Sequence, residues 1–245
     1  MKITLPRLRW IIAALLLLVT LINYADRGTL GVLKDEVCRD LNLTEIDYSH
    51  LVSVFFVAYA VMYAASGCVV DWIGARWSMA LFVCLWSISQ MCHGLATGKW
   101  SFAACRVGLG FAEPGSFPAA TKAIGEWFAP RQRALAVGIF NAGAVLGIAL
   151  TPPLAAWLAL HYGWRAAFLF TGALGIVWIL AWLAFYDSPG RHRWLKPIET
   201  DGVKATEPVT ENGPEQTVSR RMGALEIVSS RPGSLLIAAR FLTDP

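Results

Sequence analysis

Four ionisable residues stand inside long apolar stretches of this 245-residue chain. Asp26 and Arg27 interrupt the first apolar run, and Arg106 and Glu113 lie in the fourth. A run of about 20 apolar residues is long enough to cross a bilayer, where a charged side chain costs roughly 2.5–3.5 kcal/mol on insertion scales. Membrane proteins keep such residues where they face a cavity or one another. We therefore expect these four residues to form a binding or proton-transfer site.

The chemistry of the four side chains supports this expectation. An Arg guanidinium can hold a carboxylate ligand through paired hydrogen bonds. A carboxyl group at membrane depth can load and release a proton, because burial and a nearby Arg act on it in opposite directions. Arg106 and Glu113 are seven residues apart, so they share one face of a helix and lie about 10 Å apart along it. We expect the first and fourth helices to line a common cavity with two cations and two carboxylates; the alternative is a static ion network that only fixes helix packing.

Other polar residues in the apolar runs are weaker candidates. Tyr24 and Tyr59 could donate hydroxyl hydrogen bonds to a polyhydroxylated ligand. Gln90 and His93 could line the cavity, although we interpret them as packing residues whose hydrogen bonds are satisfied.

The composition is that of a helical membrane protein. Hydrophobic residues make up 56% of the chain and charged residues 16%, with 11 Trp and 21 Gly. The net charge of +4 is modest and forms no basic stripe, so we expect no nucleic-acid partner. The five cysteines show neither a CxxC motif nor metal-ligand spacing, so we expect no metal and no cofactor. The chain also lacks a nucleophile–base pairing or a phosphate loop, and we predict that it is not an enzyme.

The hydrophobic pattern predicts six membrane-spanning helices. Their approximate ranges are residues 10–33, 48–70, 77–96, 100–121, 134–160 and 166–186. Pro114-Gly115 interrupts the fourth helix directly after Glu113, and broken helices are typical of transporter binding sites. In the fifth helix, Gly143 and Gly147 form a GxxxG pattern that predicts a helix-packing face.

The loops predict the orientation. Lys and Arg are more frequent in the N-terminal tail, the turn at 71–76, the loop at 122–133 and the segment after residue 187, so we expect these parts to be cytoplasmic. Residues 187–232 read as a cytoplasmic linker. Residues 233–245 are apolar again but too short to span, so we interpret them as the start of a seventh helix; an interfacial tail helix is the alternative.

Several motifs resemble those of a known transporter family. Gly67, Asp71, Gly74 and Arg76 fit the loop between helices 2 and 3 of the major facilitator superfamily, G-x-x-x-D-R-x-G-R-[RK]. Within that superfamily, four stretches resemble the anion:cation symporters, namely residues 23–27, 106–120, 126–128 and 131–141. The stretch that begins at Glu113 and continues through 163–165 to 186–189 most resembles the hexuronate transporters.

The resemblance implies a fold and a function. The fold would be an all-α membrane protein with twelve helices in two six-helix halves, each half a 3+3 inverted repeat. This chain would be the N-terminal six-helix bundle (1–186) with the start of helix 7, and the C-terminal six-helix half would be missing. The function would be proton-coupled symport of an organic anion, a hexuronate or related sugar acid, by alternating access in the inner membrane. Two alternatives stay open: a membrane sensor that binds an anion without transporting it, and an inactive truncated half-transporter.

The resemblance also implies roles for individual residues. Asp26 and Glu113 would be the protonatable pair, and Arg106 their switchable partner. Tyr24, Arg27 and Tyr59 would contact the substrate. Gly67, Asp71, Gly74 and Arg76 would form a cytoplasmic gate.

Overall fold

A computed structural model describes residues 5–189 of the chain, and this part is helical with no β-strand. The elements are α1 (Leu5–Val32), α2 (Lys34–Asp40), α3 (Glu45–His93), α4 (Lys99–Ala112), the 3₁₀ helix η1 (Glu113–Gly115), α5 (Ser116–Trp127), α6 (Pro130–Tyr162) and α7 (Trp164–Phe185). The predicted all-α class is confirmed. Apart from residues 187–189, the predicted linker and the predicted start of a seventh helix lie outside the described residues.

Within this part, four helices are long and apolar enough to cross a membrane: α1, α3, α6 and α7. Helix α3 has 49 residues and breaks at Gly74, whose φ of 79° lies in the region that favours glycine, so it consists of two successive rods. Helices α4 and α5 join through η1 without an intervening loop. Residues 5–189 therefore form six rod-like segments, and their six crossings of a bilayer stay a prediction.

The loops are shorter in the structure than the sequence pattern predicted. The expected turn at 71–76 is helical except at Gly74, and the expected loop at 122–133 shrinks to residues 128–129. The acidic segment after the first helix contains the short helix α2. The reason is that helices extend past the apolar core into polar surroundings, where hydropathy no longer marks their ends. Local signals mark them instead: Pro130 occupies the first turn of α6, and Thr44 and Asp47 form a capping box at the start of α3.

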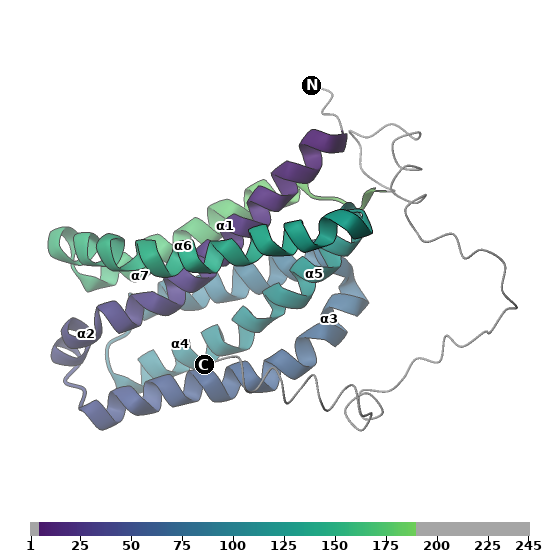
Figure 1. Cartoon of the computed structure of the whole chain (residues 1–245). Helices are drawn as coiled ribbons and strands as arrows, with labels where there is room; N and C mark the ends of the chain where they lie inside the picture. Colours follow the sequence, from purple (N-terminus) through teal and green to yellow (C-terminus); the bar gives the residue numbers. More distant parts are fainter. Residues whose placement is uncertain (1–4, 190–245) are drawn as a thin grey trace, which may run out of the picture. The chain divides into compact units, whose positions relative to one another are not determined.

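Close packing joins α1 to α6, while α3 packs against α4 and α7 (Figure 1). At Gly143 an added Cβ would lie 2.2 Å from the main-chain oxygen of Leu17, and at Gly147 it would lie 2.6 Å from that of Leu21. Only glycine permits this approach of the two backbones. The predicted packing role of Gly143 and Gly147 is therefore confirmed.

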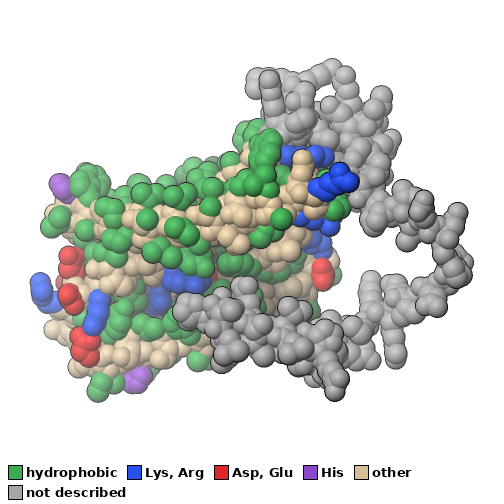
Figure 2. All heavy atoms as spheres, in the orientation of Figure 1, with side chains coloured by type: hydrophobic (Ala, Val, Ile, Leu, Met, Phe, Trp, Pro, Cys, Tyr) green, Lys and Arg blue, Asp and Glu red, His purple; other side chains and the backbone are tan. Residues whose placement is uncertain are grey.

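Charged side chains gather at the two ends of the helical unit, and apolar side chains cover much of the face between them (Figure 2). At the end that contains α2, three ion pairs join neighbouring elements: Lys34–Glu45, Asp47–Lys99 and Asp40–Arg165. At the opposite end the ion pairs are Arg76–Asp187 and Lys122–Asp71. Figure 2 also shows basic side chains in the middle of the apolar face, away from both ends.

Candidate functional site

The centre of the site is an ion pair between α1 and η1, the short 3₁₀ helix that joins α4 to α5. Glu113 begins η1 and is completely buried. Its Oε2 accepts hydrogen bonds from Arg27 Nε at 3.1 Å and from Arg27 Nη2 at 2.6 Å. About a quarter of the Arg27 side chain stays exposed. The Pro114-Gly115 break predicted from the sequence is confirmed, and it places this carboxylate where a regular helix gives way to a 3₁₀ turn.

Aromatic rings surround the two guanidinium groups of the site. Arg27 Cζ lies 4.9 Å from the ring centre of Tyr59, 5.3 Å from that of Tyr24 and 5.5 Å from that of Phe55. Arg106 Cζ lies 4.4 Å from the Phe55 ring centre, so both cations share this ring. Arg106 is 3% exposed, and its Nε and Nη1 have no hydrogen-bond partner among the described residues. The rings hold the cations by cation–π contact and leave donors free for an anion.

Asp26 lies against other helices. Its side chain is fully buried, and Gln90 of α3 donates from Nε2 to the Asp26 main-chain oxygen at 3.2 Å. The same Nε2 donates to Thr171 Oγ1 of α7 at 3.0 Å. Neither oxygen of the Asp26 carboxyl group has a hydrogen-bond partner within residues 5–189.

The structure thus divides the four charged residues that we expected to line one cavity. The Phe55 ring contacts both Arg27 and Arg106. Arg27 also pairs with Glu113 and lies against the rings of Tyr24 and Tyr59. Asp26 contacts Gln90 of α3 through its main-chain oxygen, and its side chain points about 100° away from that of Arg27, as for any adjacent helical residues. Glu113 is hydrogen-bonded to Arg27, and Arg106 makes no salt bridge in the described part of the chain.

Two polar residues of α3, Gln90 and His93, make hydrogen bonds that differ from our expectation, and Thr171 of α7 joins them as a buried polar residue. Gln90 uses its amide nitrogen twice, but its Oε1 has no partner among the described residues. His93 Nδ1 lies 2.7 Å from the Ser89 oxygen, its ring stacks on Phe168, and its Nε2 has no partner there. The interpretation of Gln90 and His93 as satisfied packing residues is therefore wrong for one atom of each. Thr171 was not predicted, because a lone threonine in an apolar helix gives no distinguishing signal.

The gate-motif residues lie at the end of the unit where α3 bends. Arg76 donates from Nη1 to Asp187 at 2.6 Å and from Nη2 to the Leu183 oxygen at 2.8 Å. Asp71 accepts from Lys122 at 3.1 Å. Gly74 supplies the bend between these two residues, and Gly67 lies in the preceding helix with open space beside its Cα. The motif thus connects α3 to α5 and to the end of α7.

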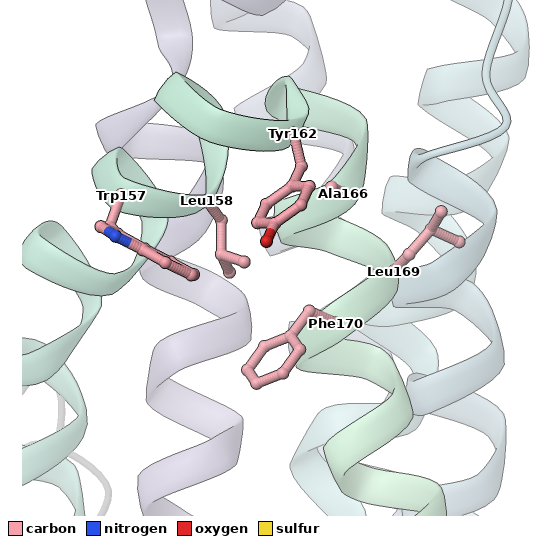
Figure 3. A pocket seen from close by; sticks show the side chains of 6 residues that line it. All are labelled: Trp157, Leu158, Tyr162, Ala166, Leu169 and Phe170. Carbon is pink, nitrogen blue, oxygen red and sulfur yellow. The ribbon is translucent and has the colours of Figure 1, made fainter.

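A separate cavity of about 540 Å³ lies between the ends of α6 and α7 (Figure 3). Its lining residues are Trp157, Leu158, Tyr162, Ala166, Leu169 and Phe170. None of them carries a charge, so this cavity offers no cation to pair with an anionic group. The described residues also contain no cluster of three or more His, Cys, Asp or Glu that could hold a metal ion.

Comparison with known proteins identifies the family. Residues 16–243 match the family model of the Major Facilitator Superfamily. The chain belongs to this superfamily. The resemblance found in the sequence is therefore confirmed.

The similar curated proteins are sugar-acid transporters by name. The chain is 33% identical over 243 residues to the hexuronate transporter of Escherichia coli (strain K12), covering 97% of this chain and 54% of that protein. It is 31% identical over 238 residues to the galacturonate transporter of Dickeya chrysanthemi, covering 97% of this chain and 68% of that protein. The chain thus spans about half of the length of the first relative and about two thirds of that of the second.

Solved structures show the same fold. A bacterial homologue of the human lysosomal transporter Spinster, in an inward-facing and unoccupied conformation, matches with a TM-score of 0.72 at 22% identity, over 90% of this chain and 48% of that one. The proton:xylose symporter XylE matches with a TM-score of 0.68 at 16% identity, over 83% of this chain and 50% of that one. These matches extend over about half of each transporter, as expected for an N-terminal half bundle.

Proposed function

We propose that this chain provides the N-terminal half of a proton-coupled symporter that takes up a hexuronate or a related sugar acid by alternating access. The similarity to hexuronate and galacturonate transporters supports the substrate class. The whole substrate site would include residues of a C-terminal six-helix half, as in the two-half organisation of this superfamily.

The main observation behind the proposal is the pairing of Arg27 with Glu113 beside the partly exposed side chains of Tyr24 and Tyr59. Arg27 uses Nε and Nη2 on Glu113, and its remaining exposed surface offers donors to a carboxylate. The Tyr24 and Tyr59 rings flank it, so their hydroxyl groups could bind sugar hydroxyls. Arg106 adds a second cation with free donors. Around Phe55 there are thus two cations, Arg27 and Arg106, and one paired carboxylate, Glu113. One positive charge remains to attract a monoanionic substrate.

The same arrangement suggests how protons couple to the substrate. A substrate carboxylate that binds Arg27 competes with Glu113 for the guanidinium, which favours protonation of Glu113. Asp26 is a second buried carboxyl group, and burial opposes its ionised form. Asp26 and Glu113 would thus take up protons with the anion, and Arg106 would move between them to promote release.

The orientation and the gate complete the proposal. The Arg76–Asp187 and Asp71–Lys122 pairs would face the cytoplasm of a multi-pass inner-membrane protein and stabilise its outward-open state. The N-terminus and the 187–232 linker would also be cytoplasmic.

Uptake of labelled galacturonate into proteoliposomes tests the substrate class, with the protein in its full natural length. We expect an acid-outside pH gradient to drive uptake, glucuronate to compete and neutral galactose not to compete, because only the acids carry the carboxylate that Arg27 binds. Binding of galacturonate without uptake would favour the sensor alternative. Equal competition by galactose would contradict the role of Arg27.

A further inference from the structure

The hydrogen bonds of Gln90 show that the Thr171 hydroxyl group accepts from Gln90 and does not donate to it. A main-chain oxygen can only accept, so the Gln90 atom that faces the Asp26 main-chain oxygen is the amide nitrogen. The same nitrogen lies 3.0 Å from Thr171 Oγ1, which must therefore accept. The hydroxyl proton of Thr171 then remains available for another acceptor.

Thr171 differs in this respect from the other threonines inside the described helices. The hydroxyl groups of Thr20, Thr29, Thr121 and Thr151 each donate to the main-chain oxygen four residues earlier, at 2.6–3.0 Å. Within residues 5–189, Thr171 makes no such bond to its own helix. Gln90 Nε2 instead joins Thr171 to Asp26, because it donates to Thr171 Oγ1 and to the Asp26 main-chain oxygen. Both carboxyl oxygens of Asp26 lack a hydrogen-bond partner within residues 5–189, so the unused Thr171 hydroxyl proton lies beside a carboxyl group that lacks a donor. Thr171 is 2% exposed and Asp26 is fully buried, so water has little access to either group.

We propose that Thr171, oriented by Gln90, is the hydrogen-bond donor to ionised Asp26 and thereby sets the pH at which this carboxyl group releases its proton. The inference rests on the proposed role of Asp26 in proton coupling. When Asp26 loses its proton to the cytoplasmic solution, its carboxylate gains the Thr171 O–H as a donor; no covalent bond of Thr171 changes. Gln90 is a positioning residue, because it occupies the acceptor side of the hydroxyl group.

Other charged groups also act on Asp26 and must stay constant in a test. Glu113 acts on it from η1, and Arg27 is its neighbour on α1. On α3 and α4 the buried charged or titratable side chains are His93, three residues after Gln90, and Arg106, which acts on His93. The charged and titratable residues of the remaining helices lie toward helix ends: Arg131, Arg133 and His161 on α6, Arg165 on α7, and Lys122 and Glu126 on α5. A substitution of Thr171 leaves all of these in place.

The test compares Thr171→Val with Thr171→Ser. Valine keeps the shape of threonine without the hydroxyl group, and serine keeps the hydroxyl group. In proteoliposomes, we expect Thr171→Val to shift the internal pH that supports half-maximal proton-driven uptake upward by about one unit, a tenfold change in proton affinity. Exchange of internal for external galacturonate at equal pH should stay within about twofold of wild type, because it needs no net proton release. Thr171→Ser should keep the wild-type profile, and Gln90→Met should shift it in the same direction by less.

Thr151→Val is the matched control, because it removes an equally buried hydroxyl group that bonds only to its own helix. An unchanged pH profile in Thr171→Val, or an equal shift in Thr151→Val, would overturn the proposal. Asp26→Asn separates this outcome from a failure of the proposed function. If Asp26→Asn leaves proton-driven uptake intact, the coupling role of Asp26 fails; if it abolishes that uptake while Thr171→Val has a wild-type profile, only the role of Thr171 fails.

Discussion

Ion pairs in the middle of the helical unit differ in burial from those at the end that contains α2. The Arg27–Glu113 pair in the middle and the Arg165–Asp40 pair at the end that contains α2 have the same 2.6 Å contact distance. The first has a fully buried carboxylate, whereas both side chains of the second are more than 40% exposed. Distance alone therefore does not distinguish the pair that we propose to be functional from a structural one.

Buried hydrogen-bonding atoms without a partner distinguish the middle from the end that contains α2. At that end, Asp40 accepts from Arg165 and from Trp164, and Asp47 accepts from Lys99 and from Thr44. In the middle, buried atoms of Asp26, Arg106 and Glu113 have no partner among the described residues. Leaving such atoms unpaired in an apolar interior costs free energy. A site that must exchange partners during a cycle needs such atoms, and a structural bridge does not.

The largest expected effect comes from breaking the central pair. Arg27→Met leaves Glu113 as an uncompensated buried charge, which we expect to lower the free energy of unfolding by about 3–5 kcal/mol. The double variant Arg27→Met, Glu113→Leu should recover much of this stability, because no unpaired charge remains, but it should not recover uptake. Thermal unfolding in detergent and galacturonate uptake measure the two effects.

The matched control is the exposed pair, tested as Arg165→Met with and without Asp40→Leu. Its effect on unfolding should be clearly smaller, and uptake should stay close to wild type. Equal losses of stability for Arg27→Met and Arg165→Met would break the distinction between middle and end. Recovery of uptake in the central double variant would show that the pair has only a structural role.

A smaller effect should appear on acidification. Hydrogen bonds from Arg165 and Trp164 lower the pKa of Asp40, and those from Lys99 and Thr44 lower the pKa of Asp47. A lowered pKa means that the stabilisation is complete above the ordinary pKa of about 4 and is lost as the pH falls below it.

Melting temperature measured between pH 3 and pH 7 tests this expectation. We expect the midpoint to decrease below about pH 4 in the wild type and to decrease less in Asp40→Asn, which has no proton to gain there. A wild-type midpoint independent of pH over this range would mean that the two aspartates do not stabilise the end that contains α2.

The sequence predicted those features that depend on local chemistry. Pro114-Gly115 cannot continue a regular helix, so the break at Glu113 could be placed correctly. The spacing of Gly143 and Gly147 predicted a helix-packing face, and the structure shows that α1 packs there. Helix ends were less predictable, as α5 shows by continuing to Trp127, because polar residues occur both in loops and in solvated helical turns.

The partners of the buried charges could not be predicted from one sequence. The spacing of Arg106 and Glu113 placed both residues on one face of the predicted fourth helix. The rotation of α1 relative to η1 decides that Glu113 binds Arg27. The packing of α1 on α3 likewise decides that the Asp26 main-chain oxygen accepts from Gln90. Such relations depend on the packing of three or more helices, and no local pattern encodes them.

The central claim is that Asp26 and Glu113 couple proton movement to uptake of a sugar acid. The most direct measurement is the alkalinisation of a lightly buffered external medium when galacturonate is added to proteoliposomes that contain the protein in its full natural length. We expect alkalinisation with the wild type and none with the double variant Asp26→Asn, Glu113→Gln, although this variant should still exchange galacturonate at equal pH. Alkalinisation of the same extent in the double variant would contradict the assignment of these two carboxyl groups.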